Sequence, residues 1–182
     1  MAAIINPCPS TSLNGIGVQC ADNIGGISRV FIAKYEDVTT TVEQGVITAI
    51  TIGETKEKFK EYNFRKATGG MTSTATINDQ NGTIYYSTVL SLQFNGTQAT
   101  KQAEINTLVR SNLAVIVEDR RGKYWYLGKD SEVTSTAATM AAGTAYEDLN
   151  GYTLELTDVS KEMPYEVDAT LITDTIIDFN NK

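Results

Sequence analysis

The chain of 182 residues contains no histidine, two cysteines and three prolines. Without histidine it has neither a Ser-His-Asp triad nor a Cys-His pair, and imidazole is excluded as a metal ligand. Cys8 and Cys20 do not make a zinc site by themselves, and they are either two free thiols or a disulfide. We therefore expect a protein that is not an enzyme and that has no metal or cofactor.

Positive charge is also scarce, because 15 Lys and Arg stand against 22 Asp and Glu, a formal net charge of −7. Electrostatic binding of nucleic acid needs clustered Lys and Arg. The one compact basic cluster, residues 120–123, follows Glu118-Asp119 and has the pattern of a solvated turn, with a phosphate contact as the alternative. No apolar run approaches a membrane span and residues 1–9 lack a signal-peptide pattern, so we expect a protein made in a cytoplasm, without a membrane partner.

Carboxylate pairs are the remaining candidates for chemistry. Glu118-Asp119, Glu147-Asp148 and the pair Asp174 and Asp178 have the residue types for glycosidase-type acid–base catalysis. Adjacent carboxylates at strand ends point to opposite faces, however, and an acidic chain contains such pairs by chance. These pairs do not change the expectation that the chain is not an enzyme.

Thr, Ile, Val and Tyr are plentiful, and these residues favour β-strands. Thr83–Phe94 has the clearest pattern, because apolar and polar residues alternate over twelve positions. Asp37–Gln44 is polar and is predicted to be a turn, and residues 131–144 are either a strand with a loop or a long excursion. Further strands are predicted at residues 27–35, 45–53, 61–67, 71–77, 113–118, 123–128, 152–159, 169–172 and 175–177.

One helix is predicted at residues 97–112, with an apolar stripe of Ala103, Ile105, Leu108 and Val109. Thr97 or Thr100 is expected to cap its start, and Asn112 to end it in a left-handed turn. The expected fold is mainly β: a single-domain antiparallel β-sandwich or barrel with one flanking helix. We divide the chain into an N-terminal arm (1–26), the domain (27–160) and a C-terminal extension (161–182).

The aromatic run Tyr124, Trp125 and Tyr126 lies on the return strand of a predicted hairpin. Such side chains stack on sugars, although a tryptophan on a hairpin belongs more often to a core or an interface. This run supports an alternative function, a carbohydrate-binding or host-recognition β-domain of a phage particle.

The arm, the sandwich, the Thr-rich hairpin and the single helix together resemble the tail tube fold of tailed bacteriophages. Gly26–Val38, Val115–Gly128 and Asp148–Leu156 are similar to segments of small structural proteins of phages that infect gut Bacteroidales, including crAss-like phages. The resemblance covers most of residues 26–160. The segments at 131–144 and beyond Lys161 depart from it, and they leave open a tail tube or a neck, connector or ring protein.

The resemblance implies a virion subunit in the tail or neck, assembled in the host cytoplasm. Copies of the chain would form rings in which sheets join around an acidic channel, so that DNA passes without specific binding. A hairpin of about Ala67–Tyr85 and the arm Met1–Gly26 would bridge to the neighbouring ring. The interface residues expected in this hairpin are Gly69, Gly70, Met71, Thr72, Ser73, Thr74, Thr76, Asn81 and Gly82.

Overall fold

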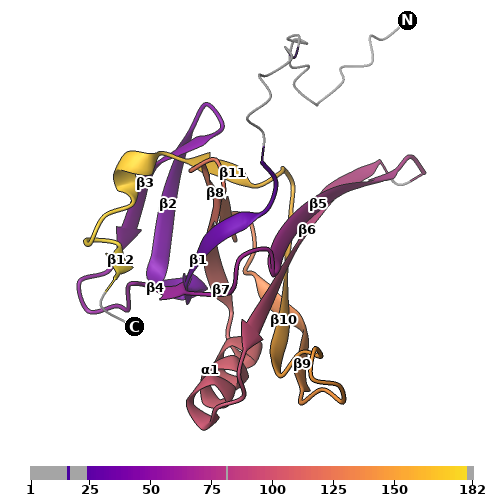
Figure 1. The fold of residues 1–182 in the computed structure, drawn as a ribbon. Coiled ribbons are helices and arrows are strands. Elements are labelled where there is room, and N and C mark those ends of the chain that lie inside the picture. Colours follow the sequence, from indigo (N-terminus) through magenta and orange to yellow (C-terminus); the bar gives the residue numbers. More distant parts are fainter. Residues whose placement is uncertain (1–15, 17–23, 81, 180–182) are drawn as a thin grey trace, which may run out of the picture.

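The computed structural model describes residue 16, residues 24–80 and residues 82–179. These residues form two β-sheets and one α-helix, with the strands of both sheets intermixed along the chain (Figure 1). The elements are β1 (Ile27–Lys34), β2 (Val38–Glu43), β3 (Val46–Ile52), β4 (Phe59–Tyr62), β5 (Gly69–Asn78), β6 (Thr83–Asn95), α1 (Ala99–Arg110), β7 (Leu113–Asp119), β8 (Tyr124–Leu127), β9 (Thr134–Ala141), β10 (Gly151–Ser160), β11 (Tyr165–Val167) and β12 (Ile177–Asp178).

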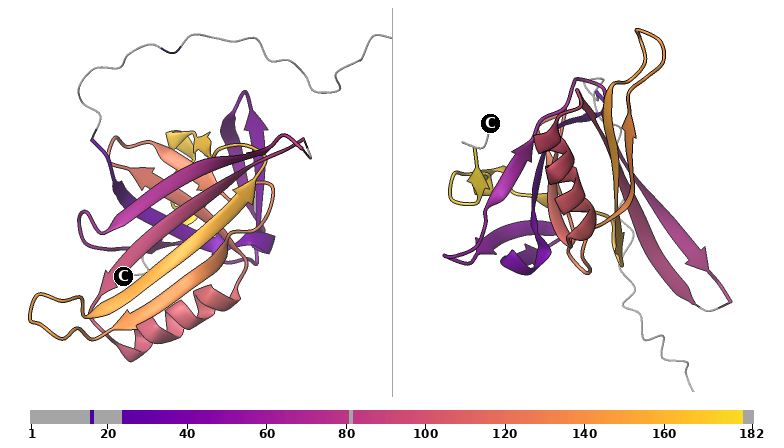
Figure 2. Two further views of the ribbon diagram at one scale, coloured as in Figure 1. Left: turned by 90° about the vertical axis from the view of Figure 1, so that its right-hand side faces the viewer. Right: turned by 90° about the horizontal axis from the view of Figure 1, so that it is seen from below.

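The larger sheet has eight strands in the order β12-β4-β1-β7-β8-β11-β3-β2 and curls into a half-barrel, and the smaller has four in the order β5-β6-β10-β9 (Figures 1 and 2). The prediction of a mainly β fold with one flanking helix is confirmed. The four-stranded sheet is antiparallel throughout. The eight-stranded sheet is mixed, because β11 runs parallel to β3 and β12 parallel to β4.

Strand β7 is buried on both faces. Leu113, Val115 and Val117 point into the space between the two sheets, whereas Ala114 and Ile116 point into the curl of the larger sheet. Successive side chains of a strand alternate between its faces, so a strand that borders two cores has an unbroken apolar run. Strand β1, which pairs with β7, divides its side chains between the same two cores.

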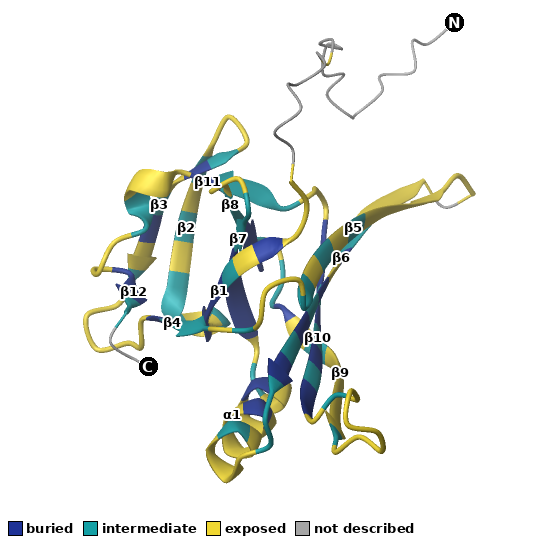
Figure 3. Cartoon of the chain, in the orientation of Figure 1, coloured by how far each residue is buried: buried dark blue, intermediate teal, exposed yellow. Residues whose placement is uncertain are grey.

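The inter-sheet core explains the pattern of β6. Leu90, Leu92 and Phe94 are buried there, in agreement with the predicted face. Ile84 belongs to the same face by alternation but is 57% exposed, because the hairpin of β5 and β6 extends past the rest of the domain (Figure 3). The sequence pattern therefore predicted the strand correctly, but it did not indicate where the core ends.

The turn predicted at residues 37–44 was wrong. Residues 37–44 contain the edge strand β2, in which Val38, Thr40 and Val42 alternate with exposed neighbours. Threonine is β-branched and favours strands, so the polarity of this segment was misleading. The turn is confined to Gln44 and Gly45, both at positive φ, the backbone that a tight hairpin requires.

The predicted strand at 61–67 begins and ends earlier, as β4, and the chain then forms a loop over residues 63–68 with Ala67 at φ 65°. The predicted strand at 169–172 is a short 3-10 helix, Ala169–Leu171. Asp168 explains this difference, because its side chain accepts hydrogen bonds from the backbone N–H and the hydroxyl of Thr170, at 2.9 and 2.8 Å. Such local bonds compete with strand pairing.

The helix is confirmed, but both predicted caps are wrong. Gln98 occupies the N-cap without a side-chain bond, and the hydroxyl of Thr97 instead donates to Asn150 at 3.2 Å. At the other end the C-cap is Ser111, with an extended backbone. Ile105 and Leu108 are the buried members of the predicted stripe, and Val109 is 41% exposed.

The structure describes little of the predicted N-terminal arm and most of the predicted C-terminal extension. The predicted arm lies outside the described residues apart from Ile16 and residues 24–26, and Cys8 and Cys20 are also outside. In the C-terminal part, β11 lies between β8 and β3 inside the larger sheet, and β12 forms an edge. Residues 165–178 thus contribute to the main sheet.

Gly151 is required by a close approach of two strands. It is the first residue of β10 and pairs with Asn95 and Ala141. A Cβ at this position would overlap the backbone carbonyl oxygen of Phe94. Backbone cannot swing aside as a flexible side chain can, so any other residue forces the two strands apart.

We predict that Gly151→Ala lowers the free energy of unfolding by about 1–3 kcal/mol, the usual cost of overpacking. The control is Gly70→Ala in β5, where a Cβ meets nothing within 4 Å and φ is not positive. Urea unfolding of both variants measures the difference. Equal stabilities of the two variants would contradict the strand-contact explanation.

Asp158 is a carboxylate in the inter-sheet region, 2% exposed, on the inward face of β10. Its Oδ1 has no hydrogen-bond partner among the described residues. Burial raises the pKa of Asp158 to about 6, against the lowering effect of the Gly128 backbone N–H and the Ser160 hydroxyl. The folded state therefore holds this proton more tightly than the unfolded chain, whose carboxyl titrates near pH 4.

The contribution of Asp158 to stability is thus unfavourable above pH 6 and disappears below pH 4. We predict that the free energy of unfolding of Asp158→Asn, relative to that of the wild-type protein, rises by about 2–3 kcal/mol from pH 4 to pH 7.5, as expected from a shift of about two pKa units. Chemical unfolding of both proteins at the two pH values measures this. If the stability difference between the two proteins did not change with pH, ionisation of the Asp158 carboxylate would not destabilise the folded state.

Candidate assembly interface

The two outer strands of the four-stranded sheet lack charged side chains. β5 reads GGMTSTATIN and β9 reads TSTAATMA, without Asp, Glu, Lys, Arg or Pro. An edge strand exposes unpaired N–H and C=O groups, and soluble proteins normally protect such edges with charges, prolines or very short strands. β5 is therefore chemically suited to pair with another strand, and so is β9 along the part that α1 does not flank (Figure 2).

The eight-stranded sheet protects its edges in the usual ways. β12 has two residues, too few to template a further strand. The other edge, β2, carries Glu43 and begins beside Asp37, which forms an ion pair of 2.8 Å with Lys56. Edge strands that are long and uncharged are thus a property of the four-stranded sheet.

The hairpin of β5 and β6 extends beyond its own sheet. β10 pairs with β6 only as far as Tyr86, so Thr76–Asn78 and Thr83–Tyr85 pair only with each other (Figure 1). Ile77 and Ile84 are register partners there, and they are 63% and 57% exposed. An isolated two-stranded hairpin is marginally stable in water, and burying each isoleucine would contribute about 1.5–3 kcal/mol.

The outward face of the four-stranded sheet is almost uncharged. By register and alternation, its only charged side chain among the described strand residues is that of Glu155 in β10. Val89 and Val159 lie exposed on this face. The other members are mainly hydroxyl-bearing: Thr72, Thr74, Thr76, Thr83, Ser87, Ser91, Thr134, Thr139, Thr153 and Thr157.

The predicted hairpin residues divide into three groups. Thr72, Thr74 and Thr76 lie on the outward face at the open edge, together with Gly70. Met71 packs against the inter-sheet core, Ser73 accepts a hydrogen bond of 2.9 Å from Thr88, and a Cβ on Gly69 would meet Ile27 and Phe64. Gly82 is in the turn at φ 63°, and Asn81 lies outside the described residues. Three of the nine predicted residues thus contact the rest of the fold, and four lie on the outward face at the edge of the sheet.

The aromatic run does not form one surface. Tyr124 and Tyr126 face the core inside the curled sheet, where Tyr126 is 2% exposed. Trp125 points to the other side of β8, and its indole N–H donates to Asp119 at 3.3 Å. The three rings therefore cannot stack together on one sugar.

Three of the six acidic residues considered for catalysis, Glu118, Asp119 and Asp148, have structural partners. Glu118 is paired with Arg29, and Asp119 accepts from the backbone N–H groups of Arg121 and Lys123 at 2.8 and 2.9 Å. Asp148 accepts from two backbone N–H groups of its own loop, which hold its pKa below the ordinary value. These contacts explain the carboxylates as parts of turns and ion pairs.

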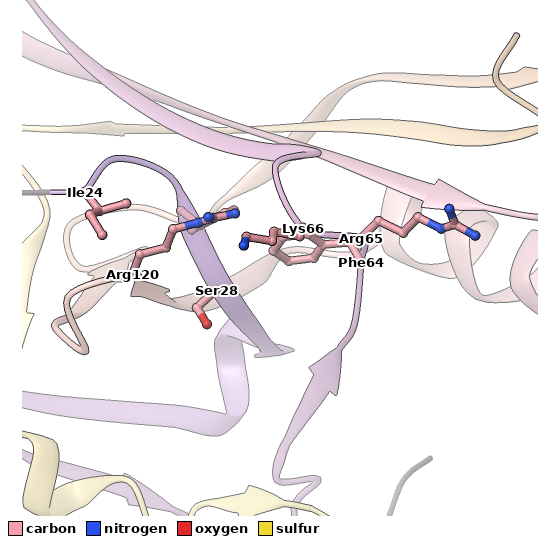
Figure 4. Close-up of a pocket in the computed structure, with 7 residues that line it drawn as sticks. Ile24, Ser28, Phe64, Arg65, Lys66 and Arg120 are labelled. Carbon is pink, nitrogen blue, oxygen red and sulfur yellow. The ribbon is translucent and has the colours of Figure 1, made fainter. Parts of the chain in front are cut away.

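One feature that the sequence did not indicate is a basic hollow of about 450 Å³ beside the start of β5 (Figure 4). Arg120 and Lys66 extend towards it from opposite sides, and Arg65 points away. Its lining also includes Ser28 and apolar residues, with Ile27 and Phe64 among them. Arg120 belongs to the predicted basic turn, but Lys66 comes from a distant loop, so only the fold brings them together.

In the described part of the chain, no group of three or more Cys, Asp or Glu residues has the arrangement to hold a metal ion. No helix in that part has the length and apolar character needed to span a membrane.

Comparisons of the chain with protein-family models, with curated proteins and with solved structures found no match, so the arrangement of its own residues carries the functional argument.

Proposed function

We propose that this chain is a virion structural protein that assembles edge to edge into rings, as a tail tube or as a neck or head-to-tail connector component. The observation that carries the proposal is the four-stranded sheet, whose edge strands β5 and β9 contain neither charged residues nor proline. A ring needs two different complementary surfaces on each copy, and opposite edges of one sheet meet that need. The resemblance to tail tube proteins supports the same architecture.

The geometry of the sheet suits this association. Its strands alternate in direction, so β5 of one copy and β9 of the next run antiparallel when the copies are related by rotation. The joined sheets would then continue from copy to copy without a break. Main-chain hydrogen bonds would supply the affinity, as in other cases of strand addition.

The nearly uncharged outward face supports a passage for DNA. It presents hydroxyl groups and the single carboxylate of Glu155, and no cation for a phosphate. If this face lines the channel, DNA meets no clustered positive charge there and does not adhere. The hairpin beyond β10, with Ile77 and Ile84, would pack against the neighbouring ring.

We predict that Thr74→Lys in β5 weakens self-association at least tenfold, because a lysine on an open edge hinders strand addition. Thr139→Lys in β9 should act similarly at the opposite edge. Thr153→Lys is the matched control, because it places the same charge on the same face but on the central strand β10. Sedimentation velocity over a range of concentrations measures the association of all three.

If the control weakened association as much as the two edge variants, the interface would be the face of the sheet and not its edges. If none of the three changed the association, the four-stranded sheet would not be the interface.

We predict that replacing Thr76–Tyr85 by Asn-Gly shortens the hairpin and prevents stacking of rings while leaving the domain folded. Asn-Gly favours the tight turn that would join Ala75 to Tyr86, which are register partners. The removed segment carries Ile77 and Ile84 but makes no ladder to β10. Electron microscopy distinguishes single rings from stacks, and circular dichroism checks the fold.

Stacks that persist in this variant would exclude the hairpin from ring-to-ring contact. As a matched control for loss of an exposed aliphatic group, Val109→Thr on α1 should stack as the wild-type protein does, since Val109 is 41% exposed and far from the hairpin.

A further inference from the structure

The basic hollow beside β5 has uncompensated charge. Arg120 and Lys66 form no ion pair among the described residues, whereas Arg29, Lys34, Lys56, Lys60 and Lys123 all do. The lining of the hollow contains these cations and no carboxylate, in a chain with seven more acidic than basic groups. Two like charges that converge repel each other until an anion lies between them.

The side chains of the hollow are held in place. The backbone N–H of Arg120 donates to the Gly26 carbonyl at 3.2 Å, and its guanidinium lies against Gly26, where a Cβ would come within 3.1 Å of Nε. Lys66 is placed by the loop that leads into β5, the open edge strand. Ile27 and Phe64 give the hollow an apolar wall (Figure 4). A ligand with a carboxylate beside an aromatic or aliphatic group fits this chemistry.

The loop between β9 and β10 has that composition. Tyr146 is fully exposed, and Glu147 follows it. The loop is braced, because the Asp148 carboxylate accepts from the backbone N–H groups of Thr144 and Ala145, at 2.8 Å each. Tyr146 and Glu147 therefore stand at the exposed tip of a supported loop.

The register of the sheet places the hollow and this loop at the same end. Gly69, at the start of β5, lies in one row with Leu92, Leu154 and Ala138. The loop of residues 63–68, which contributes Lys66 to the hollow, immediately precedes Gly69. β9 ends at Ala141, three residues after Ala138, and the loop with Tyr146 and Glu147 follows it. Figure 2 shows both loops at the end of the sheet opposite the hairpin tip. They lie on opposite edges, about three strand spacings of 4.8 Å apart.

From this arrangement we infer that the hollow between Lys66 and Arg120 binds the Tyr146-Glu147 tip of the next copy in the ring. The inference rests on the proposed edge-to-edge assembly and deepens it. When β9 of one copy adds to β5 of the next without a shift of register, the two loops come side by side. The carboxylate of Glu147 then lies between the two cations, and the Tyr146 ring covers the apolar wall. The contact fixes which edges meet and in what register.

The test uses full-length protein in three forms: wild type, Lys66→Glu and Glu147→Lys. Each single variant brings like charges together at every contact between its own copies, so each should lose self-association at least tenfold. An equimolar mixture of the two variants should associate again, because alternating copies restore an opposite-charge pair at every contact. Lys161→Glu is the control, an exposed lysine near the opposite end of the sheet, and it should stay within twofold of wild type.

Sedimentation velocity and light scattering give the association, and circular dichroism shows that each variant is folded. Misfolding of one variant would not mimic the predicted result, since a misfolded protein does not recover when mixed with another.

Three outcomes would overturn the inference. If the wild-type protein forms rings and both single variants assemble equally well, the hollow does not bind the Tyr146-Glu147 tip, and the proposed function is unaffected. Loss of assembly with Lys66→Glu but not with Glu147→Lys would show that the hollow takes another anion. Inorganic phosphate identifies that case if it changes the thermal stability of the wild-type protein but not that of the Lys66→Glu variant. A wild-type protein that is monomeric at every concentration would overturn the proposed function together with the inference.

Discussion

The structure depends on one constraint, the burial of β1 and β7 on both faces. β7 contributes Val115 and Val117 to the core between the sheets and Ile116 to the core within the curl. The two cores therefore share their central strands. Through β1 and β7, the packing of one core is linked to the packing of the other.

The same constraint leaves the four-stranded sheet with an asymmetric role. Its inward face completes the inter-sheet core through Leu90, Leu154 and Leu156. Its outward face and both edges carry almost no charge, whereas the strands of the larger sheet carry Arg29, Glu118 and other ionised groups. Charge is thus separated between the sheets. The proposed assembly would give this a reason, because the edges of the four-stranded sheet would meet other copies and its outward face would line the channel.

The sequence predicted much of this fold, because period-two alternation in β6 and β10 and the apolar run of β7 are local signals of burial. The prediction failed where one local sequence pattern is compatible with two different structures. The threonines of β2 were interpreted as a turn although they form an edge strand, and the strand-like Ala169–Leu171 is turned by the Asp168 side chain. The parallel pairings of β11 and β12 depend on contacts between distant segments and leave no local pattern.

The candidate site was predictable in part for the same reason. The Thr-rich hairpin was visible because its residues are consecutive, but the hollow joins Lys66 to Arg120 across the fold. Its expected occupant belongs to another copy, which no single chain displays. The exposed isoleucines of the hairpin and the uncharged edges are physical features that a solitary soluble domain avoids, and the proposed assembly would give both a reason.

The most direct test of the central claim is electron cryo-microscopy of the purified full-length wild-type protein at high concentration. We expect closed rings in which the four-stranded sheets of neighbouring copies join, β5 against β9, into a continuous barrel around a channel. Particles that are only compact monomers, or rings joined through the eight-stranded sheet, would contradict it.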